Sequence, residues 1–68
     1  MTNTELLEDR IAKSGFKRSY IANRIGKTTY ALALKINNKS EFKASEIDVL
    51  CELLGLNTED RMAIFFAN

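Results

Sequence analysis

The sequence predicts an all-α fold, and three features of its 68 residues support this prediction. The chain contains no proline, the residue that most strongly interrupts helices. Its apolar residues recur three and four positions apart, the spacing that places them on one face of a helix. Gly15, Gly26 and Gly55 fall where these apolar patterns stop, as is typical of helix C-termini. We therefore expect five helices and no sheet, in a single domain spanning residues 1–68.

The expected helices follow one another along the chain with short connections. They cover about residues 4–14, about residues 18–25, a segment from a Thr28 cap to about residue 36, a segment from residue 44 or 45 to Gly55, and a segment after a cap at Asn57 or Thr58. Phe16 and Leu56 are expected to be the apolar contacts that follow two of the glycines. The residues expected to face the core are Leu7, Ile11, Ile21, Ala22, Ile25, Leu32, Ile36, Ile47, Leu50, Cys51, Leu54, Met62, Phe65 and Phe66. For the last two, one ring facing a partner is the alternative.

The residue inventory argues against catalysis and against bound cofactors. The chain has no histidine, the commonest general base and metal ligand, and one cysteine, which without histidine cannot build a structural zinc site. Its three glycines are too scattered for a phosphate-binding loop. We therefore expect a protein that is not an enzyme and has no metal, no cofactor and no small-molecule substrate.

Nothing in the sequence indicates a membrane or an export signal. No apolar run approaches the roughly 18 residues of a membrane span, and the first ten residues lack the basic start and apolar stretch of a signal peptide. The single Cys51 suits a reducing compartment. We expect a cytoplasmic protein.

The charges are strongly segregated along the chain, although the net charge is only +1. Between Arg10 and Lys43 there are nine basic residues and one acid, Glu41, whereas the segments on either side are acidic. A basic centre suggests a surface that faces a polyanion. The alternative is a set of solvated lysines that the acidic helices balance in space. On the first interpretation, one face carries the bases Lys17, Arg18, Lys27, Lys35 and Lys39, with the acids of the first and fourth helices elsewhere.

Residues 18–36, RSYIANRIGKTTYALALKI, contain two short helices joined by a glycine turn. Ala22 is a small residue in the first of these helices, Gly26 follows four positions later, and Leu32 lies six positions further on. This pattern resembles the lambda-repressor-like helix-turn-helix family, also called the Cro/CI or XRE type. The resemblance extends to the helix before the motif, the two helices after it and the KINNKSEF stretch.

The resemblance implies a five-helix lambda-repressor-like bundle whose second and third helices form the helix-turn-helix. It further implies a phage or prophage repressor in the cytoplasm of a Gram-positive bacterial host. Its partner would be double-stranded DNA, with the third helix in the major groove and the second crossing the backbone. A homodimer on a palindromic site is the natural arrangement, and the apolar fifth helix is the expected dimer surface. The alternative is a protein-interaction module that reuses this fold.

The expected DNA contacts lie at the ends and on the outward face of the third helix, and at the start of the second. Lys17 occupies a cap position without a capping side chain, so the first amides of the second helix are expected to be free for a phosphate. Leu34 is expected to be largely exposed. The complete set of expected DNA-binding residues is Lys17, Arg18, Ser19, Lys27, Thr28, Thr29, Tyr30, Ala33, Leu34, Asn37, Asn38 and Lys39.

Overall fold

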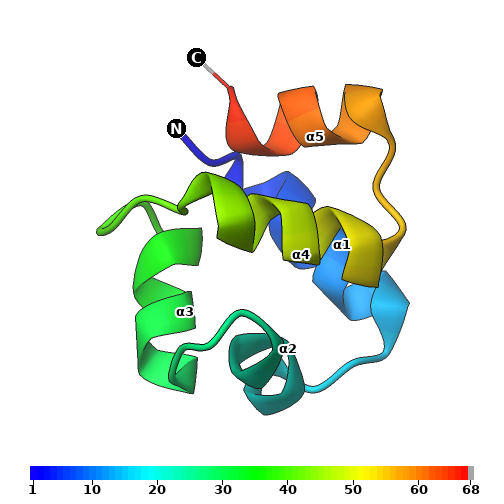
Figure 1. Cartoon of the computed structure of the whole chain (residues 1–68). Helices are drawn as coiled ribbons and strands as arrows, with labels where there is room; N and C mark the ends of the chain where they lie inside the picture. The colour runs from blue at the N-terminus through cyan, green and yellow to red at the C-terminus, as the bar shows by residue number, and fades with distance from the viewer. Residues whose placement is uncertain (68) are drawn as a thin grey trace.

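The computed structural model describes residues 1–67, and these residues form five helices and no strand (Figure 1). The predicted all-α class with five helices is therefore confirmed. No helix among these residues is both long enough and apolar enough to cross a membrane. The helices are α1 (Thr4–Ser14), α2 (Arg18–Arg24), α3 (Thr29–Ile36), α4 (Ala44–Leu54) and α5 (Thr58–Phe65).

Short polar side chains cap three of the helices. The Thr28 hydroxyl accepts a hydrogen bond from the Ala31 amide, and the Asn57 side chain accepts one from the Asp60 amide, which confirms both expected caps. Asn3 caps α1 in the same way through the Leu6 amide. Each such cap satisfies an amide that has no partner inside its own helix.

The turn between α2 and α3 depends on Gly26. Its φ of 72° lies in the left-handed region, which is open to glycine and strained for most other residues. In this conformation the Lys27 amide donates to the Ala22 carbonyl at 2.9 Å. The bond closes the end of α2, which stops at Arg24, one residue earlier than expected. As a result, α3 begins only a few residues after α2 ends, and the two helices pack against each other.

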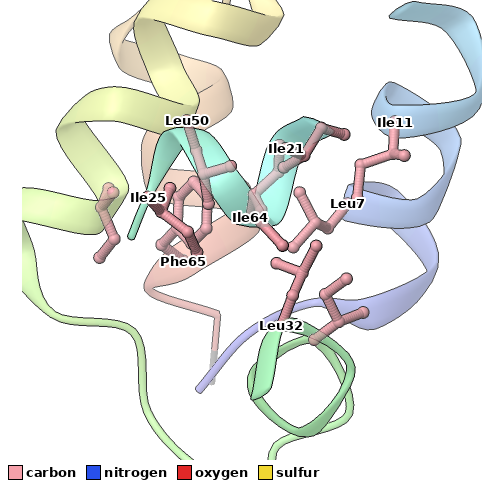
Figure 2. Packing of buried hydrophobic residues seen from close by; sticks show 11 residues of the cluster. Leu7, Ile11, Ile21, Ile25, Leu32, Leu50, Ile64 and Phe65 are labelled. Carbon is pink, nitrogen blue, oxygen red and sulfur yellow. The ribbon is translucent and has the colours of Figure 1, made fainter. Parts of the chain in front are cut away.

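All five helices contribute to one hydrophobic core (Figure 2). Cys51 and Leu54 pack against it while half-buried. Burial raises the pKa of the Cys51 thiol, which fits its expected role as a small apolar side chain. The buried core residues are Leu7, Ile11, Ile21, Ala22, Ile25, Leu32, Ile36, Ile47, Leu50, Ile64 and Phe65.

The expected buried side of α5 was wrong in part. Ile64 and Phe65 are buried, whereas Met62 is 56% exposed and Phe66 is 52% exposed. Successive residues on a helix point about 100° apart, so Phe66 at the end of α5 points about 200° away from Ile64 and cannot face the same core. Ile64 and Phe65 therefore form the core side of α5, and the side chains of Met62 and Phe66 remain in solvent.

The first four residues tie the loop after α3 to the end of α5. The Asn38 side-chain amide bonds both backbone groups of Thr2, accepting from its N–H and donating to its carbonyl, each at 2.8 Å. The Asn3 amide donates to the Ile64 carbonyl at 2.6 Å, and the Ala67 amide donates to the Met1 carbonyl at 3.1 Å. We call residues 1–4 the N-terminal segment.

Candidate nucleic-acid interface

The outward face of α3 is partly exposed and largely apolar. Tyr30 is 74% exposed, and Thr29 and Asn37 are also exposed. Ala33 and Leu34 are half-buried, so the expectation that Leu34 would be largely exposed was wrong. Leu32 and Ile36 fill the opposite side of the helix and belong to the core. The face is therefore presented to solvent by a helix that is anchored from behind.

Two polar residues of this region are already hydrogen-bonded to their own helix. The Thr28 hydroxyl caps α3, and the Asn37 side-chain amide donates to the Ala33 carbonyl at 3.0 Å. The Asn37 side-chain oxygen and the Thr29 hydroxyl are the remaining polar groups beside Tyr30. Such groups are suited to hydrogen bonds with base edges, while the apolar groups are suited to thymine methyls.

The start of α2 is exposed, as expected, at Lys17, Ser19 and Arg18. Lys17 occupies the cap position, and its side chain makes no capping hydrogen bond, as the sequence predicted. The Arg18 guanidinium pairs with the Glu8 carboxylate of α1. An acid of α1 thus lies beside one of the expected phosphate contacts, so Arg18 must exchange or share its partner in order to bind an anion.

Lys35 does not lie on the outward face, and this expectation was wrong. Its side chain is buried, its ammonium lies 3.0 Å from Glu46 Oε1 of α4, and it donates to the Glu41 carbonyl at 2.8 Å. Lys27 is half-buried, with its ammonium 3.9 Å from Glu46 Oε2. An acid of α4 therefore lies among bases that were expected to be free of acids.

The loop after α3 presents Lys39 to solvent and uses Asn38 internally. Asn38 adopts a φ of 62°, a left-handed conformation that asparagine tolerates better than most residues, and its side chain holds Thr2. Lys39 is exposed and forms no ion pair within residues 1–67. Of these two expected contacts, Lys39 is the one whose side chain is available.

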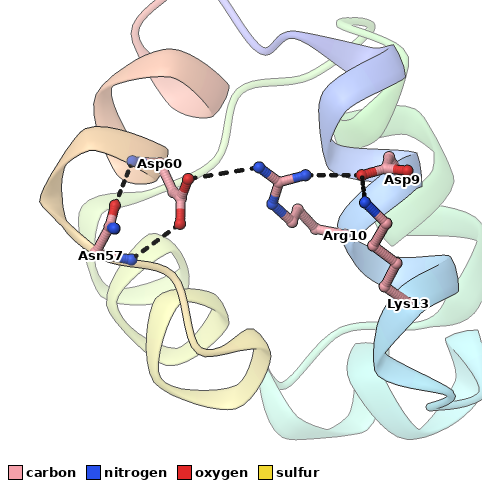
Figure 3. Close-up of polar contacts among 5 residues, drawn as sticks. All are labelled: Asp9, Arg10, Lys13, Asn57 and Asp60. Carbon is pink, nitrogen blue, oxygen red and sulfur yellow. Dashed lines mark hydrogen bonds and ion pairs between the residues drawn. The ribbon is translucent and has the colours of Figure 1, made fainter.

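Other bases of the basic centre are balanced in space. Arg10 bridges Asp9 of α1, at 2.7 Å, and Asp60 of α5, at 3.5 Å, and Lys13 also pairs with Asp9 (Figure 3). Hydrogen bonds from Lys13 and Arg10 lower the pKa of Asp9, so this carboxylate stays charged. These charges join α1 to α5 and take no part in the outward face of α3. The interpretation that acidic helices balance the bases therefore holds for Arg10 and Lys13, and a surface that faces a polyanion stays a prediction for the exposed bases.

A cluster formed by α2 and the residue two positions before it was missed in the sequence. Phe16 is exposed, and the centre of its ring lies 5.1 Å from the centre of the Tyr20 ring. The Arg24 guanidinium donates to the Tyr20 hydroxyl at 3.0 Å. The four-residue spacing of Tyr20 and Arg24 places them on one helix face, and that spacing was the available signal.

No family model, curated protein or solved structure matches this chain. Within residues 1–67, no three cysteine, histidine or acidic side chains are grouped so that they could hold a metal ion.

The Glu46 carboxylate should make stability depend on pH. Burial raises the pKa of this carboxyl, but the Lys43 amide and the ammonium groups of Lys35 and Lys27 lower it more, and the net shift is downward. A lowered pKa stabilises the fold above the ordinary glutamate pKa, and this contribution is lost as the pH falls through the folded-state value. The pH dependence of stability that arises from Glu46 should therefore be confined to acidic pH.

We expect Glu46→Gln to lower the free energy of unfolding by about 1–3 kcal/mol at neutral pH, because the buried Lys35 ammonium loses its charged partner. Urea titrations at a series of pH values would measure this. The difference from the wild type should be full at about pH 6 and should shrink as the pH falls below the ordinary glutamate pKa. A difference that stays constant over this range would show that the carboxylate charge contributes nothing.

Proposed function

We propose that this protein is a sequence-specific DNA-binding transcription regulator in which α2 and α3 act as a helix-turn-helix. The proposal includes a lambda-repressor-like arrangement of the five helices. Ala22 is buried at the start of the close α2–α3 connection, and Gly26 makes the turn between them. Leu32 anchors α3 from the core side. These three residues support the proposal because a helix-turn-helix requires a small buried residue, a tight turn and a core anchor at those positions.

One observation carries the proposal. A partly exposed helix face with Tyr30 near its start is preceded by exposed cations at the start of α2 and followed by an exposed cation after α3. In the proposed complex, α3 enters the major groove, and Tyr30, Leu34 and Asn37 approach the base edges. The flanking cations, Lys17, Arg18 and Lys39, contact phosphates and set the position of the protein on the duplex.

The proposed regulator acts as a homodimer, because one such domain reads few base pairs and two copies read a palindrome. The proposed contact is the solvent side of α5, which bears Met62 and Phe66. In Figure 1, α5 lies at the end of the molecule opposite α2, so a partner on α5 leaves α3 uncovered. Sedimentation analysis of the free protein measures this association directly.

A protein-interaction module is the second candidate function. The apolar character of the α3 face favours it, since Tyr30 stands beside half-buried Ala33 and Leu34 with few polar groups. Fold analogy does not decide between these functions, because function depends on the site.

Electrophoretic mobility shifts at several salt concentrations test the proposal. With three phosphates contacted per subunit, log affinity should fall against log salt with a slope of about −2.7 per subunit. Affinity that does not change with salt would count against phosphate binding. Binding is measured for duplexes selected from a random pool and for scrambled versions of the same duplexes, so that specific and non-specific affinity can be compared.

Arg18 and Glu8 should have opposite effects on binding. Arg18→Ala should weaken binding to selected and scrambled duplexes alike and reduce the salt slope by about 1, because a phosphate contact carries no sequence information. Glu8→Gln should strengthen binding to both, because it frees the guanidinium and removes a negative charge beside the DNA. If Arg18→Ala weakens only the selected duplex, Arg18 reads a base.

A further inference from the structure

We propose that Glu46 is a positioning residue for the DNA-reading helix: its single carboxylate holds both ends of α3, through Lys27 before the helix and Lys35 in its last turn. This inference rests on the proposed function. It also assigns Lys27 as a partner of Glu46 instead of a phosphate contact.

The two oxygens of the carboxylate have different surroundings. Oε1 accepts a hydrogen bond from the Lys43 amide at 2.8 Å and lies 3.0 Å from the Lys35 ammonium. Oε2 lies 3.9 Å from the Lys27 ammonium. It is a buried oxygen without a hydrogen-bond partner, and the Glu46 residue as a whole is only 4% exposed. A buried carboxylate oxygen in this situation depends on a nearby cation, and Lys27 is the cation that faces it.

The two lysines lie eight positions apart, with Lys27 two residues ahead of the first residue of α3. Eight positions correspond to about two helical turns, so their stems start near the two ends of this short helix. Both ammonium groups nevertheless converge on one carboxylate in the first turn of α4. A displacement of either end of α3 would therefore lengthen one of the two ion pairs.

The two lysines differ in how firmly they are held. Lys35 also donates to the Glu41 carbonyl and lies over the Phe42 ring, 5.9 Å from its centre, so its ammonium is enclosed. Lys27 remains half-buried, and the pair with Glu46 is its ion pair within residues 1–67. Apolar contacts allow a helix to slide or rotate, whereas charged groups at both ends favour one position. Of the two lysines, Lys27 is therefore the one whose replacement should loosen α3 while disturbing the packing of the core least.

The test compares the half-buried Lys27, which faces Glu46, with the exposed Lys39, which forms no ion pair within residues 1–67. Lys27→Met and Glu46→Gln are measured beside Lys39→Met, in which an exposed lysine is changed in the same way. Each variant binds a duplex selected from a random pool and a scrambled duplex of the same composition, over a range of salt concentrations. Circular dichroism at the binding temperature verifies folding.

We expect Lys27→Met and Glu46→Gln to lower the affinity ratio of selected to scrambled duplex by about tenfold, the scale of one lost base contact. Their salt slopes should stay at the wild-type value. Lys39→Met should weaken both duplexes alike and reduce the slope by about 1. Lys27→Arg should restore the ratio, since it keeps the charge that faces Glu46.

Two results would overturn the inference. A reduction of the salt slope by about 1 in Lys27→Met would make Lys27 a phosphate contact. An unchanged affinity ratio in folded Lys27→Met would show that the ion pair does not position α3. If Glu46→Gln does not fold, the two Lys27 variants decide the matter by themselves.

The free protein separates failure of this inference from failure of the proposed function. If the wild type binds no duplex at any salt concentration, the DNA-binding proposal fails. Amide hydrogen exchange then tests the positioning in the free chain. Faster exchange of the α3 amides in Lys27→Met than in Lys39→Met would support the role of Glu46 in holding α3, and equal exchange would overturn it.

Discussion

Leu50→Ala is expected to remove a large part of the folding stability of this protein. Leu50 lies on α4 and is completely buried in the core that all five helices share (Figure 2). Truncating a buried leucine to alanine costs about 2–5 kcal/mol, because apolar contact is lost and a cavity remains. A domain of this size has a total stability of roughly 3–10 kcal/mol. Urea unfolding followed by circular dichroism should show a much lower midpoint.

Met62→Ala provides the control for this substitution. Met62 has a side chain of similar size but is largely exposed on α5, so its truncation should change stability by less than about 0.5 kcal/mol. Equal losses for the two variants would mean that the core is not built as described. A large loss for Met62→Ala alone, dependent on protein concentration, would place Met62 in a subunit contact.

Tyr30→Asp is expected to have the largest effect on DNA binding. Tyr30 is the most exposed aromatic residue of the proposed reading face, so the substitution should leave folding almost unchanged. In a major groove, the new carboxylate would lie near phosphates and replace a contact to the bases. The affinity should fall by at least about 1–3 kcal/mol, which a mobility shift measures directly.

Thr58→Asp adds the same charge at the exposed start of α5, where a helix N-terminus tolerates an acid, and it should leave DNA affinity close to that of the wild type. Sedimentation of both variants separates the two candidate functions. If Tyr30→Asp dissociates an oligomer while DNA binding persists, the face of α3 is a protein interface, and the DNA-reading assignment is wrong.

The helices could be predicted because each end has a local cause. Gly15, Gly26 and Gly55 all adopt the left-handed conformation, and Thr28 and Asn57 cap the helices that they precede. The rotation of a helix about its own axis is harder to predict, because it depends on the neighbouring helices. The side of α5 that faces the core depends on where α1 and α4 lie, so Phe66 was placed wrongly although the helix itself was expected.

The candidate site could be predicted in part. The exposure of Tyr30 follows from its position on the side of α3 opposite Leu32 and Ile36. The burial of Lys35 also had a signal, because Lys35 lies one turn from Leu32 on the same side of the helix. Its partner Glu46 is eleven residues away on another helix, and no spacing rule connects residues at that separation. Ion pairs between helices are a property of the tertiary fold.

The hydrogen bonds of the N-terminal segment make the two described ends of the chain one cooperative unit. Thr2 is bonded to the loop after α3, Asn3 to the last turn of α5, and Met1 to Ala67. Many small domains lose their first residues by fraying, which leaves the rest of the fold intact. Here, release of the first residues would free the loop that carries Lys39 and the end of α5 in the same event. Local unfolding at one end of the sequence would therefore spread to the loop after α3, more than thirty positions away.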